Sequence, residues 1–211
     1  MTQTQLRAHD LLWVSETPKA MDGAPLPDWA ITAYRQGAPV VVRRAPRSTD
    51  GSVPVGLRGG ARHERCAATV AANSITRVVS PEGLAAQAVS IAHDAPFAAL
   101  RTLRALAPRL NALGWAWGPT GGAGFALASG LPVLHADSDL DLVVRMPRAP
   151  STAQRDQLAR LLGDTECRVD LQIDTGHGGF ALRDWLASPH QTLLKTDHGP
   201  RLVADPWSDA A

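Results

Sequence analysis

Cysteine is scarce in this sequence. Its two cysteines, Cys66 and Cys167, lie 101 positions apart. They form neither the closely spaced pairs that bind zinc nor the C-x-x-C motif of thiol redox enzymes. We therefore expect two reduced thiols in a cytoplasmic protein, because disulfide bonds seldom persist in that compartment.

Long hydrophobic runs are also missing. No apolar run approaches the roughly 20 residues that a helix needs to cross a bilayer. The first five residues, MTQTQ, show neither the basic nor the apolar region of a secretory signal. Since 45% of the 211 residues are hydrophobic, the sequence still has ample material for a globular core. These features predict a cytoplasmic globular protein that does not associate with membranes.

A strong charge of either sign is absent as well. The formal net charge is +1; residues 1–92 carry 10 Lys and Arg against 7 Asp and Glu, and residues 93–211 carry 11 against 13. Neither half is basic enough for a nucleic-acid-binding module, so we expect no nucleic-acid partner. The first half could still attract phosphate groups locally.

The first half of the chain has the turn and periodicity signals of short strands and helices. Gly37 is expected to end one helix, and Pro81 to begin another. The stretch at 85–93 is the expected domain boundary, which divides the chain into residues 1–92 and 93–211. The expected elements of the first half are strands over 11–14, 38–44 and 53–58, and a helix over 28–36.

The second half shows clearer periodicity. Apolar residues at spacings of three and four predict an amphipathic helix that is capped by Asp94 and ends at Gly114, with a kink or break at Pro108. Ser151 is expected to cap a second helix. Further expected elements are strands over 115–117 and 167–174, and a hairpin over 192–204.

The central motif is a run of aspartates, His135-Ala136-Asp137-Ser138-Asp139-Leu140-Asp141-Leu142. Alternation over residues 138–143 predicts a strand, which would place Asp139 and Asp141 on one face. Two neighbouring carboxylates repel each other unless a cation lies between them, and a divalent metal is the usual one. The alternative is a solvated edge strand with two surface aspartates.

Two further features could complete a site around these aspartates. Four glycines occur within residues 118–124, and the turn at Gly121-Gly122 opens a predicted short helix whose free N–H groups suit a phosphate chain. Asp170 lies on the later strand, on the face opposite its apolar residues. If the two strands are neighbours, the three carboxylates could surround two divalent metals.

Several arginines are candidates for phosphate binding. Arg58 and Arg62 flank Gly59-Gly60, and guanidinium groups beside glycine N–H groups can bind phosphate. The alternative there is a basic surface loop. Arg145 could likewise bind phosphate or a partner protein, or could be a plain surface residue.

Together these residues resemble a known family. A Gly-Gly or Gly-Ser turn, an Asp-x-Asp strand and a third Asp on a later strand form the pattern of the DNA-polymerase-beta-like nucleotidyltransferases. The sequence is more similar still to the phosphoribosyl-dephospho-CoA transferases, the holo-acyl-carrier-protein synthases of malonate decarboxylase. One departure is Gly122, where relatives often have serine, so that a hydroxyl contact to the triphosphate is missing. The similar segments are residues 9–13, 55–59, 124–142, 178–182 and 199–207.

The resemblance implies a fold and a reaction. The fold would be α+β, with a small N-terminal α/β domain over 1–92 that covers the substrate. Residues 93–211 would form a polymerase-beta-like nucleotidyltransferase domain with a mixed sheet flanked by helices. The enzyme would transfer the phosphoribosyl-dephospho-CoA group from 2'-(5''-triphosphoribosyl)-3'-dephospho-CoA to a serine of the malonate decarboxylase acyl carrier protein, and pyrophosphate would leave.

In that reaction the resemblance gives each predicted site residue a role. Asp139 and Asp141 would hold Mg²⁺ on the triphosphate, and Asp170 would complete a second metal site and help to activate the serine. Gly121, Gly122, Arg58 and Arg62 would bind substrate.

Two other classes of function remain open from the sequence. One is a nucleotidyltransferase that acts on another protein, a small molecule or an RNA end. The other is a non-catalytic phosphate-binding module with a degenerate metal site, although Asp139, Asp141 and Asp170 are all present.

Overall fold

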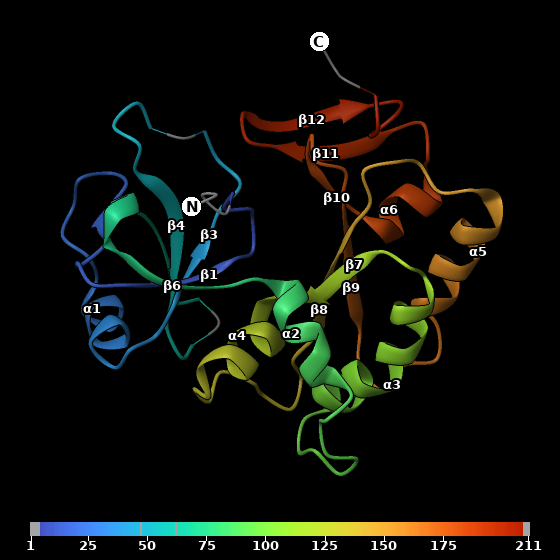
Figure 1. Ribbon diagram of the computed structural model, residues 1–211, viewed down its shortest axis with the longest axis horizontal. Coiled ribbons are helices and arrows are strands. Elements are labelled where there is room, and N and C mark those ends of the chain that lie inside the picture. The colour runs from blue at the N-terminus through green and yellow to red at the C-terminus, as the bar shows by residue number, and fades with distance from the viewer. Residues whose placement is uncertain (1–4, 47, 62, 209–211) are drawn as a thin grey trace. The chain divides into compact units, whose positions relative to one another are not determined.

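The computed structural model describes residues 5–46, 48–61 and 63–208 (Figure 1). The chain divides into two compact units. Unit 1 comprises Met1–Ser80 with Ala128–Val133, and unit 2 comprises Pro81–Leu127 with Leu134–Ala211. Helices and strands occur in both, so the predicted α+β class is confirmed. The predicted domain limits, 1–92 and 93–211, stay a prediction.

Unit 1 is built on an antiparallel sheet, drawn in blue to green in Figure 1. Its strand order is β2-β5-β4-β3-β1-β6. Valines and leucines of the strands form the core with Ala30 of an α-helix, because β-branched side chains suit a half-buried pleated surface. The elements are β1 (Leu11–Val14), β2 (Lys19–Ala20), α1 (Asp28–Arg35), β3 (Val40–Val42), β4 (Val53–Arg58), β5 (Arg65–Val70), the 3-10 turn η1 (Ala72–Ser74) and β6 (Ile75–Val79).

Unit 2 contains a mixed sheet, as predicted. Its strand order is β12-β11-β10-β9-β8-β7. Strands β8 and β9 pair in parallel, and the other neighbours pair antiparallel. The strands are β7 (Ala116–Pro119), β8 (Leu140–Arg145), β9 (Val169–Asp174), β10 (Gly179–Ala181), β11 (Thr192–Thr196) and β12 (Gly199–Val203). The helices are α2 (Pro81–Ala88), α3 (Ala98–Ala112), α4 (Gly121–Ser129), α5 (Thr152–Leu161) and α6 (Leu182–Ala187).

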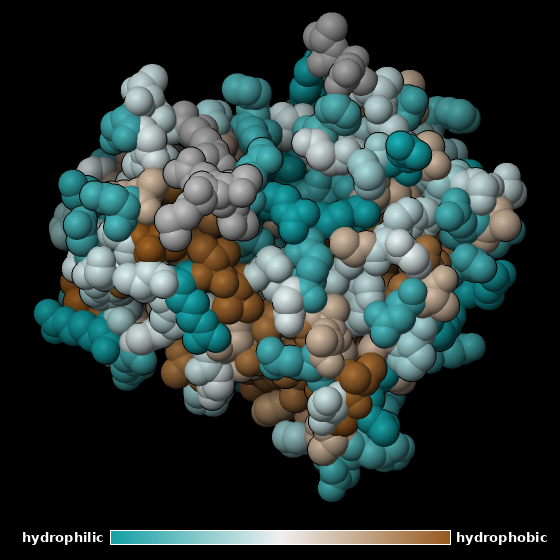
Figure 2. Space-filling view, viewed as in Figure 1, coloured by the Kyte–Doolittle hydropathy of each residue, from teal (hydrophilic) through white to brown (hydrophobic). Residues whose placement is uncertain are grey.

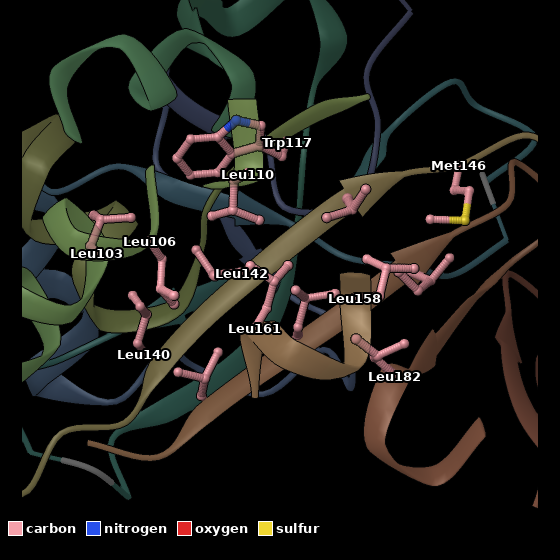
Figure 3. Packing of buried hydrophobic residues seen from close by; sticks show 14 of the residues in the cluster. Leu103, Leu106, Leu110, Trp117, Leu140, Leu142, Met146, Leu158, Leu161 and Leu182 are labelled. Atoms are coloured by element: carbon pink, nitrogen blue, oxygen red, sulfur yellow. The ribbon is translucent and has the colours of Figure 1, made fainter. Parts of the chain in front are cut away.

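The core of unit 2 lies on one face of this sheet. Leu140, Leu142 and Val144 of β8 are buried there, together with Val169 and Leu171 of β9. Because side chains alternate along a strand, Asp141, Arg145 and their neighbours at every second position lie on the opposite face. Figure 3 shows the leucines that α3, α5 and α6 pack against the core face, namely Leu103, Leu106, Leu110, Leu158, Leu161 and Leu182.

Helix α2 packs on that opposite face, beside β7. A Cβ at Gly118 would overlap the backbone of Pro81, so β7 and the first turn of α2 are in close contact at a residue without a side chain. Gly118 pairs with Val143 of β8, which places both on the face that carries Asp141. The predicted helix start at Pro81 is confirmed.

The predicted start of helix α3 and its predicted break at Pro108 were wrong. Helix α3 begins after Phe97 and not at Asp94, because Pro96 disfavours helical geometry in the residue before it. The helix also continues through Pro108 without a break. Buried Leu106 and Leu110 hold it on the sheet on either side of that exposed proline. The Ser151 cap is confirmed: Ser151 and Gln154 form a reciprocal capping box.

The surface shows scattered apolar residues. In Figure 2, hydrophilic residues cover much of the visible face and hydrophobic residues form separate patches. Among the described residues, the large hydrophobic ones with exposed side chains are Met21, Val78, Val89, Leu193 and Leu202. Among the residues that the structure describes, no helix combines the length and the apolar character needed to cross a bilayer.

Candidate active site

Gly121 and Asp141 are in direct contact where β7 leads into α4. Thr120 precedes the helix and donates its N–H to the Asp141 carbonyl at 2.9 Å. Gly121 then has φ +53°, in the left-handed region that favours glycine. A Cβ at this position would overlap the Asp141 carboxylate. The missing side chain therefore leaves the space in which that carboxylate lies, at the N-terminus of a nine-residue helix.

Asp141 and Asp170 are register partners. In the parallel pair of β8 and β9, Asp141 lies directly opposite Asp170. Opposed residues of neighbouring strands present their side chains to the same face, so the two carboxylates share the face that Gly121 borders. The two strands are neighbours, which is the condition on which the sequence-based site depended.

Asp139 lies immediately before β8, and not within a strand as predicted. It is half-buried. The start of β8 is fixed against the start of β9, because Leu140 donates its N–H to the Arg168 carbonyl at 2.9 Å. The segment before Asp139 is a turn in which Ser138 Oγ accepts a hydrogen bond from His135 N at 2.9 Å. Asp139 is thus held at the same end of the two strands as Asp141 and Asp170.

Arg168 makes an ion pair with Asp170. Its Nε and Nη2 both lie 3.0 Å from Oδ1 of Asp170. The arginine side chain is 63% exposed and the aspartate side chain 38%. No local pattern assigned a role to Arg168, although its position two residues before Asp170 on a predicted strand places both on one face.

The carboxylates fit Mg²⁺ in their chemistry and partly in their arrangement. Mg²⁺ prefers oxygen ligands, and one or two carboxylates with substrate phosphates are its usual protein environment. Asp141 and Asp170, which lie opposite each other in the strand register next to Gly121, meet that requirement. Within the described part of the chain, however, no three His, Cys, Asp or Glu side chains already form a metal-binding group. The three-carboxylate metal site therefore stays a prediction, and Arg168 lies against one of its members, Asp170.

Arg145 is a structural residue, which corrects the prediction that it could bind phosphate. It is only 8% exposed. Its Nε lies 2.8 Å from Oε1 of Glu82 in α2, and its Nη1 lies 2.6 Å from Oδ2 of Asp174 in β9. The guanidinium therefore bridges helix and sheet on the face that carries Asp141. Sequence periodicity could place Arg145 on that face, but it could not reveal Glu82 as its partner.

The other predicted substrate-binding residues are placed as follows. Gly122 is buried in the first turn of α4, next to Gly121. Arg58 ends β4 in unit 1, opposite Arg65 of β5. In the turn that follows, the Ala61 N–H donates to the Glu64 carboxylate at 2.8 Å. Arg62 lies outside the described residues.

Comparisons with known proteins cover nearly the whole chain. Residues 84–206 match the phosphoribosyl-dephospho-CoA transferase MdcG C-terminal domain, and residues 7–81 match the corresponding N-terminal domain. No solved structure matches the chain.

Several proteins called phosphoribosyl-dephospho-CoA transferase are similar to this chain. One from Pseudomonas putida (strain GB-1) is 46% identical over 205 residues, which cover 96% of this chain and 95% of the relative. One from Azotobacter vinelandii is 45% identical over 217 residues and the full length of both. One from Pseudomonas aeruginosa is 46% identical over 202 residues, which cover 94% and 92%.

These matches, which include both halves of the chain and the segment that carries the aspartates, show a transferase enzyme. The chain belongs to the phosphoribosyl-dephospho-CoA transferase family.

Proposed function

We propose that the protein attaches the prosthetic group of the malonate decarboxylase acyl carrier protein. The donor is 2'-(5''-triphosphoribosyl)-3'-dephospho-CoA, and the acceptor is a serine hydroxyl of the carrier protein. A bond forms between the serine oxygen and the α-phosphorus, and the bond to pyrophosphate breaks. The hydroxyl proton leaves to a carboxylate of the site, Asp170 in this proposal. We place the reaction in the cytoplasm.

One observation carries this proposal. Asp141 lies opposite Asp170 in the strand register, and the Asp141 carboxylate occupies the space that a side chain at Gly121 would fill. A phosphate chain on the N-terminus of α4 would meet N–H groups of the Gly121-Gly122 turn. Asp139 and Asp141 would hold Mg²⁺, and Asp170 would complete the set. Bound Mg²⁺ supplies positive charge that offsets the charge of the triphosphate and of the departing pyrophosphate.

The residues of the chain contribute mainly by positioning. In phosphoryl transfer most catalysis comes from alignment of the attacking and leaving oxygens and from charge stabilisation. The hydrogen bond from Thr120 N to the Asp141 carbonyl fixes the turn relative to β8. The parallel ladder fixes β8 relative to β9. The phosphate-binding turn and two carboxylates thus have set relative positions before substrate binds.

The first test replaces Asp141 by Asn, which keeps the size of the side chain and removes its charge. We expect transfer to the carrier protein to fall at least about a hundredfold, a loss typical of removing transition-state charge stabilisation. Folding should persist, because the change relieves repulsion with Asp170. Intact-mass measurement of the carrier protein, pyrophosphate release and thermal melting would follow both effects at several Mg²⁺ concentrations.

The matched control is Asp156→Asn. Asp156 is exposed on α5, which packs on the other face of the sheet. It should leave transfer unchanged. Wild-type turnover in Asp141→Asn would refute the metal assignment. Wild-type protein that binds the triphosphate but leaves the carrier protein unmodified would refute the acceptor, and other proteins, small molecules and RNA ends would then be tested.

A further inference from the structure

Arg168 differs in kind from the other arginine on this face of the sheet. Arg145 is buried and bridges two carboxylates, Glu82 and Asp174. Arg168 is exposed, and Asp170 is its partner. Removal of Arg145 would leave buried acids uncompensated, whereas removal of Arg168 would expose an acid that already meets solvent. The fold therefore requires Arg145 and does not require Arg168.

The contact between Arg168 and Asp170 is one that can be exchanged. Both nitrogens of the guanidinium approach the same oxygen, Oδ1, so the pair lacks the parallel two-oxygen geometry that makes arginine–carboxylate contacts strong. An exposed pair of this kind contributes little to stability, because solvent competes for both groups. A divalent cation bound at Asp141 and Asp170 would compete with Arg168 for the same carboxylate.

The charges around the site favour a second position for the guanidinium. Asp139, Asp141 and Asp170 place three negative charges at one end of two strands, and they repel any phosphate chain that approaches. A cation that leaves Asp170 when a metal binds there is already next to the incoming anion. Arginine suits this task because its planar fork matches the oxygens of a phosphate group.

We infer that Arg168 is a phosphate-binding residue that exchanges partners, from Asp170 in the ligand-free protein to the triphosphate of the substrate in the loaded one. The inference rests on the proposed function for the identity of the phosphate-bearing substrate. It makes Arg168 a competitor of the metal before substrate binds and a partner of the substrate afterwards. A residue with a structural role alone would not show these opposite effects.

The test measures two affinities in the full-length protein by calorimetry. One is for Mn²⁺ alone, as a substitute for Mg²⁺, and the other is for inorganic tripolyphosphate at saturating Mg²⁺. We expect Arg168→Gln to bind Mn²⁺ several-fold more tightly, because Asp170 is released. We expect it to bind tripolyphosphate about tenfold more weakly, because a charge-assisted hydrogen bond is lost.

Two control variants make the result specific. Arg201→Gln removes an exposed arginine from the edge strand β12 and should change neither affinity. Arg168→Lys keeps the charge without the fork and should lose less tripolyphosphate affinity than Arg168→Gln. All three variants should melt within a few degrees of the wild type, since surface substitutions seldom change stability by more than about 0.5 kcal/mol.

The outcomes separate this inference from the proposed function. Unchanged affinities in Arg168→Gln, or a loss of both affinities together, would overturn the role of Arg168. The same holds if the wild type binds neither probe. If the opposite shifts appear but the carrier protein is not modified by the wild type, Arg168 keeps its role and the proposed acceptor is wrong.

Discussion

Gly121 combines two constraints at one residue. Its backbone has φ +53°, which costs a residue with a side chain roughly 1–2 kcal/mol. The space beside its Cα is occupied by the Asp141 carboxylate. Any other residue here would strain the turn and also push a candidate metal ligand out of place.

Gly121→Ala is therefore expected to affect both stability and catalysis. Stability should fall by about 1–2 kcal/mol from backbone strain, with a further loss from the overlap with Asp141. Transfer to the carrier protein should fall more than stability alone explains, because Asp141 must move. Urea denaturation and steady-state transfer rates would measure the two effects.

Gly114→Ala is the matched control for this substitution. Gly114 also has a positive φ, of +74°, and a Cβ there would meet no atom within 4 Å. It should lose stability from strain alone and keep its transfer rate. Equal transfer rates in Gly121→Ala and Gly114→Ala would show that the overlap with Asp141 has no functional consequence.

Helix α2 is the element whose place in the fold depends on a buried charge. Glu82 in its first turn pairs with Arg145 of β8, which also pairs with Asp174 of β9. Close packing of Pro81 on Gly118 adds a steric contact. A buried ion pair is costly to break from one side, because the remaining partner keeps its desolvation penalty.

Arg145→Gln should therefore destabilise the protein by about 3–5 kcal/mol. Arg101→Gln is the comparison, because it breaks an ion pair with Glu166 whose side chains are 31% and 55% exposed. That loss should be about 0–1 kcal/mol. Denaturant unfolding of both variants would give the difference, and similar midpoints would show that Arg145 is not a structural residue.

The sequence predicted those elements that local signals define. The alternating residues of β8 and β9, the Ser151 cap and the hairpin of β11 and β12 follow from spacing and turn chemistry alone. The strands β2, β5, β6 and β10 were missed. They owe their conformation to their sheet neighbours, and β2 has only two residues.

The candidate site divides in the same way. Alternation placed Asp141 and Asp170 on the polar faces of their strands, and the glycine content identified the turn at Gly121. The contact partners of the two arginines could not be predicted from the sequence. Neither the ion pair of Arg168 nor the bridge made by Arg145 follows from a local pattern. Both depend on which strands and helices become neighbours in three dimensions.

For the whole molecule, the position of α2 makes a prediction about truncation. A fragment over 93–211 lacks α2, so it leaves Arg145 without Glu82 and uncovers Gly118. A fragment over 81–211 keeps both contacts. We expect the longer fragment to be more stable by several kcal/mol, since it retains a buried ion pair. Thermal melting of the two would test this, and equal melting temperatures would contradict it.

The parallel pairing of β8 and β9 also has a kinetic consequence. Parallel neighbours cannot be joined by a tight turn, so Asp141 meets Asp170 only after the crossover through α5 has closed. Such non-local closures are slow, because chain entropy is lost before the contacts form. The two carboxylates therefore come together late in folding. A ligand that bridges them would bind only the completed unit, and its binding free energy would add to the stability of the whole sheet.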